Sequence, residues 1–131
     1  MFSLIKIEST NKVKLTMKQY LSPEQTAKLI ELGFEKPKNE RWVLDIANES
    51  TPSIQNVVKR QDYSIGELIE ILPISFEIEN DITVWLEIEV GIGWSVLYSY
   101  CGSAEYDCEG KELIDALFDM IVKLKEEGVI C

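Results

Sequence analysis

The stretch ITVWLEIEVGIGWSVLYSY, residues 82–100, decides the fold class. Its first nine residues place an apolar set on one side of the chain and a more polar set on the other, namely Ile82, Val84, Leu86, Ile88 and Val90 against Thr83, Trp85, Glu87 and Glu89. Alternation with a period of two predicts a half-buried β-strand. Residues 91–93 then predict a hairpin turn, and the aromatic and β-branched residues of 94–101 predict an antiparallel return strand.

Two helices are expected before this hairpin, because each has a capping box at its start. Ser22 and Gln25 form the first box around Pro23, and Ser64 and Glu67 form the second. The first helix is expected to bury an apolar side made of Ala27, Leu29, Ile30 and Leu32. Further strands are expected at 2–7, 13–17, 42–46 and 76–79, whereas 53–60 are expected to form a loop with at most one helical turn.

A long helix is expected from about Gly110 to Glu127, where Gly128 ends it. At 100° per residue its apolar side chains gather on one side, with Leu113, Leu117, Met120, Ile121 and Leu124 at the centre. The order of the elements predicts an α+β fold, in which a mainly antiparallel sheet is packed on one face by helices. A chain of 131 residues fits a single domain, residues 1–131.

Composition excludes several kinds of chemistry. The chain has no histidine, which excludes Ser-His-Asp and Cys-His catalysis and histidine metal ligands. Its net charge is −10, which argues against direct binding to the phosphate backbone of nucleic acids. The charge is uneven, since residues 1–60 carry ten basic and seven acidic groups, whereas residues 61–131 carry three basic and sixteen acidic groups. The glycines at 91 and 93 lack the residues of a phosphate loop. No catalytic or cofactor-binding residue, and no cofactor, is expected.

The three cysteines, Cys101, Cys108 and Cys131, are expected to be reduced thiols of a cytosolic protein. The separation of the first two is too wide for a metal-binding knuckle, so no metal site is expected. Residues 102–104 (Gly-Ser-Ala) are expected to form a flexible loop before the long helix. The neighbouring carboxylates of Glu105, Asp107 and Glu109 are expected to raise the pKa of a cysteine thiol in this segment.

Two groups of residues make a candidate interaction surface. Glu112, Asp115, Asp119 and Glu126 form an acidic stripe on the long helix, which Lys111 and Lys123 partly neutralise at i,i+4 spacing. The stripe is interpreted either as a solvated face or as a surface for a basic partner. Trp85, Glu87 and Glu89 share the polar side of the strand at 82–90, which is either a solvent-facing surface or a place for carboxylate chemistry.

The aromatic side of the return strand also has two interpretations. Trp94, Val96, Tyr98 and Tyr100 share one side of that strand. If this side faces the helices, the four residues belong to the core, and the size of their side chains favours this arrangement. If it faces solvent, they form an interaction surface with Trp85.

Three segments resemble a known group of proteins: YLSPEQTAKLIELG (20–33), YSIGELIEILP (63–73) and KELIDALFDMIVKLKEEG (111–128). Together they are similar to small uncharacterised bacterial proteins that are often found in prophage or other mobile elements. The resemblance implies an intracellular accessory protein of bacterial or phage origin. It implies no catalytic residues.

These observations favour a non-enzymatic cytoplasmic protein that acts through contact with a basic protein partner. An alternative is an acidic nucleic-acid mimic that inhibits a DNA-handling host protein. A carboxylate-dependent hydrolase is the third hypothesis. No apolar run is long enough for a membrane span, and residues 1–10 lack the features of a secretory signal.

Overall fold

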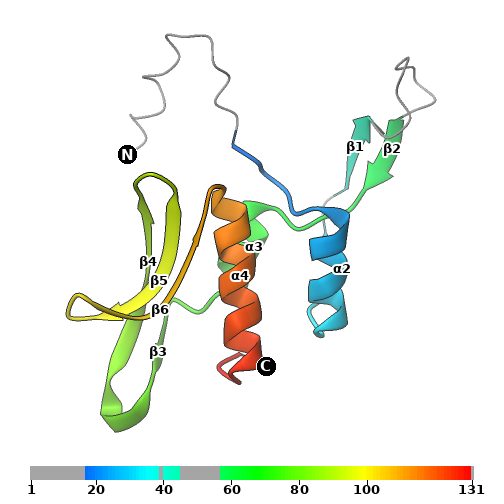
Figure 1. Ribbon diagram of the computed structural model, residues 1–131. Coiled ribbons are helices and arrows are strands. Elements are labelled where there is room, and N and C mark those ends of the chain that lie inside the picture. Colours follow the sequence, from blue (N-terminus) through cyan, green and yellow to red (C-terminus); the bar gives the residue numbers. More distant parts are fainter. Residues whose placement is uncertain (1–16, 39, 45–56, 131) are drawn as a thin grey trace.

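The computed structural model describes residues 17–38, 40–44 and 57–130 (Figure 1). The expected strands at 2–7 and 13–17 therefore lie outside the described residues, except for Met17, and so do 45–46 and 53–56. The described elements are α2 (Pro23–Glu31), β1 (Arg41–Leu44), β2 (Val57–Arg60), α3 (Ile65–Ile71), β3 (Ser75–Glu77), the 3-10 turn η4 (Glu79–Asp81), β4 (Thr83–Val90), β5 (Trp94–Tyr100), β6 (Ser103–Gly110) and α4 (Leu113–Glu126).

The four later strands form one antiparallel sheet in the order β3-β4-β5-β6. Strand β4 is confirmed, and the alternation in burial holds in its first part, where Val84 is completely buried and Trp85 is 55% exposed; Ile88 and Val90, on the same side as Val84, are exposed. Gly91 donates its N–H to the carbonyl of Gly93 and closes the hairpin between β4 and β5. The expected α+β fold is confirmed.

Residues 103–110 form strand β6, so the prediction of a loop at 102–104 was wrong for 103 and 104. The turn occupies only Cys101 and Gly102, whose φ angles of 52° and 80° are both in the left-handed region. Two such residues between paired strands match a type I′ turn, which suits the twist of a hairpin. As a result α4 starts at Leu113, three residues later than expected.

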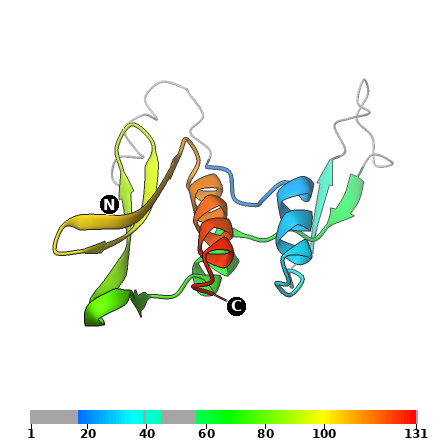
Figure 2. The same ribbon diagram turned by 60° about the horizontal axis from the view of Figure 1, so that its bottom comes forward.

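The helices cover one face of this sheet, as expected, with α4 against β5 and β6, α3 beside α4, and α2 on the far side of α4 (Figures 1 and 2). The core lies between these layers. Its largest fully buried side chains include those of Leu29, Leu68, Val96, Tyr98, Ile114, Leu117, Met120 and Leu124. Each such aliphatic side chain contributes roughly 1.5–3 kcal/mol when it is fully buried. The packing of α4 on the sheet is therefore a major stabilising contact.

The aromatic side of β5 faces the core. Val96 and Tyr98 are completely buried, and the Tyr98 hydroxyl donates a hydrogen bond of 2.6 Å to the carbonyl of Pro73. Trp94 packs against the same core. Tyr100 is 44% exposed because it lies at the end of the strand, beyond a bulge in the pairing with β6.

Both capping boxes are confirmed. The side chain of Ser22 accepts from the N–H of Gln25, and the side chain of Ser64 accepts from the N–H of Glu67. The buried side of α2 differs from the prediction, however, because Ala27 and Ile30 are exposed and Thr26 is buried with Leu29.

The hairpin of β1 and β2 projects beside α2 (Figure 1). It corrects the expected loop at 53–60, because 57–60 pair as a strand with residues 41–44. The buried carboxylate of Asp62 lies at its base. It accepts from the Thr26 hydroxyl at 2.9 Å, and the guanidinium groups of Arg41 and Arg60 lie 3.3 and 3.6 Å away. This cluster joins the hairpin to α2.

Candidate functional site

The face of the four-stranded sheet that points away from the helices gathers carboxylates of strands β4 and β6. Strand register sets their positions in rows. One row joins Glu87, Leu97 and Asp107, and the next joins Glu89, Ser95 and Glu109. This surface is called the outer face below. Residues 75–110, which form the sheet, contain eight acidic residues and no lysine or arginine.

Four carboxylates, Glu87, Glu89, Asp107 and Glu109, form the acidic quartet of the outer face. All four residues are exposed. Neighbours along one strand are about 7 Å apart, and the two rows span two strand spacings, about 10 Å. None of the ion pairs found within the described residues involves the quartet. The quartet is therefore an exposed negative surface without ion pairs in this part of the chain, and Lys111 lies near its Glu89 and Glu109 end.

An apolar strip accompanies the quartet. Leu97 lies between Glu87 and Asp107 and is only 8% exposed, although it is on the outer face. Trp85 is one step further along β4, opposite Ser99, and more than half of its surface is exposed. An exposed tryptophan beside charged residues offers a partner both apolar area and a hydrogen-bond donor.

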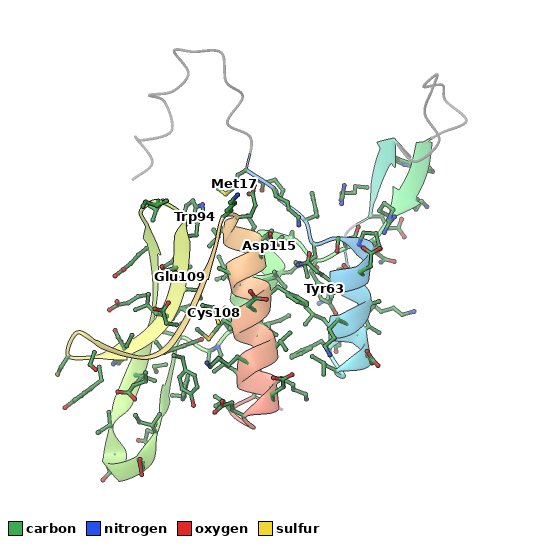
Figure 3. All side chains as sticks on the ribbon, viewed as in Figure 1. Met17, Tyr63, Trp94, Cys108, Glu109 and Asp115 are labelled. Carbon is green, nitrogen blue, oxygen red and sulfur yellow. The ribbon has the colours of Figure 1, made fainter. Side chains whose placement is uncertain are left out.

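The acidic stripe of α4 lies on a different surface from the quartet, because α4 packs on the opposite face of the sheet. Two of its residues form hydrogen bonds within the fold, and Figure 3 labels one of them, Asp115. The carboxylate of Glu112 accepts from the backbone N–H of Lys18 at 3.1 Å. Asp115 accepts from Lys18 Nζ and from Gln25 Nε2, both at 3.1 Å. Asp115 thus pairs with Lys18, not with Lys111, and fastens the chain before α2 to α4.

Asp119 and Glu126 are the exposed members of the stripe. Partial burial of the Asp119 carboxyl group, and then the nearby Asp115 carboxylate, raise the pKa of Asp119 above its usual value. Cys108 on β6 lies close to it. Burial is the main cause that raises the pKa of the Cys108 thiol, and the charges of Asp119 and Asp107 raise it further, against Lys123, which lowers it. A raised pKa keeps this thiol protonated and unreactive at neutral pH.

The described residues give little support for a reaction centre. No three histidine, cysteine or carboxylate side chains among them are grouped to hold a metal ion. An open hollow of about 930 Å³ at the β4–β5 turn is lined by Glu89, Ser95, Glu109 and Lys111 among others. A second, of about 620 Å³, lies between residues 34–38 and α3. Glu89 lines the first hollow, whereas Trp85 and Glu87 line neither; all three side chains are exposed, which agrees with the solvent-facing interpretation of this side of β4.

No helix in the described part of the chain combines the length and the apolar character needed to cross a bilayer.

The structure thus divides the six candidate residues into two groups. Trp85, Glu87 and Glu89 share the outer face, whereas Glu112, Asp115 and Asp119 lie along α4. Sequence reasoning missed Asp107 and Glu109 as members of the outer face, because it placed the start of their strand in a loop. A signal was present, since Tyr106 and Cys108 alternate with these carboxylates.

Comparisons of the chain with protein-family models, with curated proteins and with solved structures found no match.

Proposed function

We propose that this chain is a non-enzymatic, cytoplasmic protein-binding module that contacts a basic partner through its outer face. The observation that carries the proposal is the acidic quartet, four exposed carboxylates that form no ion pair within the described residues. A basic surface placed against the quartet relieves its mutual repulsion. Such complementarity speeds association and excludes acidic competitors.

Trp85 supplies the apolar part of the proposed contact. Charged groups in a rim set orientation and rate, whereas buried aromatic side chains carry much of the affinity of protein interfaces. The outer face has both, with the exposed Trp85 adjacent to the quartet. The resemblance of three segments to prophage and mobile-element proteins adds the proposal that the partner belongs to the bacterial host or to such an element.

The test compares three forms of the chain as bait in nuclease-treated bacterial lysate. The first is the wild type, and the second is the quartet variant Glu87→Gln, Glu89→Gln, Asp107→Asn, Glu109→Gln. The third is a charge-matched control that neutralises exposed carboxylates on the helices, namely Glu24→Gln, Glu31→Gln, Glu70→Gln and Glu126→Gln. We expect a stoichiometric basic partner to be recovered by the wild type and the control but not by the quartet variant.

Recovery of the same partner by all three forms, or of no stoichiometric partner by the wild type, would contradict the proposal. Thermal unfolding of each purified form serves as the folding control. Binding should also weaken as salt is added, because exposed charges are screened over about 10 Å at 0.1 M ionic strength.

Mimicry of nucleic acid is a second candidate, and the two parallel rows of the quartet favour it. In that case the partner is a DNA-handling protein whose basic groove accepts the outer face. The same bait experiment separates the two candidates, because added double-stranded DNA should compete with a mimic for its partner. Partner retention that DNA leaves unchanged would rule out mimicry and leave the first proposal intact.

A further inference from the structure

The edge of β4 is only partly covered. Strand β3 pairs with residues 83–85, and the N–H of Leu86 donates to the carbonyl of Ile74 at 2.9 Å. Beyond that bond, within the described residues, β4 has a neighbour only on its β5 side. Residues 87–90, on the side away from β5, are called the free β4 edge.

The backbone groups on this edge follow from the register. In an antiparallel ladder, the N–H and C=O of one residue point to the same neighbour, and successive residues alternate. Because the N–H of Leu86 points toward β3, those of Ile88 and Val90 also point away from β5. Two donors and two acceptors are thus presented along the free β4 edge.

Exposed apolar side chains line the same edge. Ile88 and Val90 are 37% and 46% exposed. They lie on the same side of β4 as Val84, which is buried in the core. Ile74 and Ile92, at the two ends of the edge, are 73% and 109% exposed. An unprotected apolar edge strand is a template for pairing with another chain.

The opposite edge of the sheet, on β6, lacks this combination. Its apolar side chains Tyr106 and Cys108 pack against the core beneath α4, and a bulge interrupts its pairing. Bulges and covering elements blunt the tendency of a sheet edge to pair. The β4 edge is therefore the better place for strand addition.

We propose that the free β4 edge binds an extended segment of a partner protein in which basic and apolar residues alternate. The added strand forms backbone hydrogen bonds with Ile88 and Val90. Its apolar side chains lie beside those of Ile88 and Val90, and its basic side chains lie on the outer face beside Glu87 and Glu89. A second copy of this chain fits less well, because symmetric pairing of two β4 edges brings these glutamates together.

This inference rests on the proposed function and names the chemistry of its partner. The probe is a synthetic peptide that alternates lysine and valine, with capped ends. One control peptide has the same composition with the lysines and valines in separate blocks, and another is methylated on alternate backbone nitrogens. Hydrogen exchange of the amides of Ile88 and Val90, and calorimetric titration, report binding to the full chain.

We expect the alternating peptide to slow exchange at these two amides by about tenfold or more, and both control peptides to bind at least about tenfold more weakly. Ile88→Pro removes an N–H that faces the free edge, a position where proline is tolerated. We expect it to abolish binding, while Ile88→Ala, which keeps the N–H, binds the peptide measurably.

Equal binding of the alternating and block peptides overturns the inference, but it leaves intact the proposed contact between a basic partner and the outer face. Slow exchange of both amides before peptide is added also overturns it, because the edge is then occupied by a second copy or by the chain itself. Loss of the partner by Ile88→Pro but not by the quartet variant supports backbone pairing at the edge, and it contradicts both the proposed function and the basic side chains assigned beside Glu87 and Glu89. The methylated peptide keeps the test decisive if Ile88→Pro does not fold.

Discussion

Asp62 and the acidic quartet are carboxylates that the fold treats in opposite ways. Asp62 is 3% exposed and lies between two guanidinium groups and a hydroxyl. The quartet is exposed and has no cation within ion-pairing distance in the described residues. The charge that is unevenly distributed along the sequence is therefore also unevenly distributed in the fold. Both arginines lie in the β1–β2 hairpin, whereas residues 75–110, which form the four-stranded sheet, contain none.

The difference teaches which charges hold the fold together and which are free for a partner. A carboxylate removed from water needs compensation, and Asp62 receives it from three side chains. Exposed carboxylates on one face repel each other and contribute little or negatively to stability. Substitution of the buried Asp62 should therefore cause a large loss of stability. Substitution of exposed carboxylates should cause only small changes, including small gains.

Asp62→Ala should have the largest effect, a loss of about 3 kcal/mol in the free energy of unfolding. The change leaves two guanidinium groups and the Thr26 hydroxyl without their shared acceptor. Chemical denaturation measures the loss. Thr26→Val, which removes one hydrogen bond, should cost only about 1 kcal/mol. If Asp62→Ala lowers the free energy of unfolding by less than Thr26→Val does, the two arginines do not depend on this carboxylate.

Asp115→Ala should have a smaller effect, a loss of about 1 kcal/mol, because its pair with Lys18 is partly exposed. The carboxylate also accepts from Gln25, so its removal loosens the chain before α2 from α4. Hydrogen exchange should speed up mainly at the start of α2. If Asp115→Ala leaves both stability and exchange unchanged, the acidic stripe is a solvated surface after all.

How far these positions could be predicted depends on the range of the interaction. The β4 alternation and both capping boxes are local, so the sequence alone predicts them correctly. Strand β6 was missed at its start because Cys101 takes a left-handed conformation that a non-glycine residue seldom adopts. The partners of Asp62 come from α2, β1 and β2, and no local sequence pattern predicts that these three elements contact one carboxylate.

Only the residues of the candidate surface that belong to one strand could be predicted, because the others are brought there by non-local pairing. Trp85, Glu87 and Glu89 follow from the period of one strand. Asp107 and Glu109 join them only through the register of β5 with β6, a non-local property that depends on the turn at 101–102. Glu112 and Asp115 are acidic like the quartet, but both accept hydrogen bonds from Lys18, which is more than ninety residues away in the sequence. The sequence pattern could not show that they are bound within the fold.

The quartet variant should be slightly more stable than the wild type, by about 0.5 kcal/mol in low salt, because repulsion across the outer face is removed. The gain should shrink as salt is added, since screening relieves the same repulsion in the wild type. Thermal unfolding at several salt concentrations measures both effects. A variant less stable than the wild type at every salt concentration would mean that the quartet is structurally paired.

Asp119→Asn should have the smallest effect, and its sign depends on pH. Burial and Asp115 raise the pKa of Asp119 in the folded state, so the folded chain holds this proton more tightly than the unfolded chain does. Stability contributed by the protonated group is complete below the unfolded pKa near 3.8 and is lost as the pH rises through the folded pKa. The amide introduced by Asp119→Asn is neutral at every pH and avoids that loss.

The stability of Asp119→Asn relative to the wild type should therefore increase between pH 3 and pH 7, by less than about 0.5 kcal/mol because the residue is exposed. Unfolding of both forms across this range measures the difference. A relative stability that falls with pH would mean that the charged form of Asp119 is favoured in the fold, as expected of a carboxylate with a cationic partner.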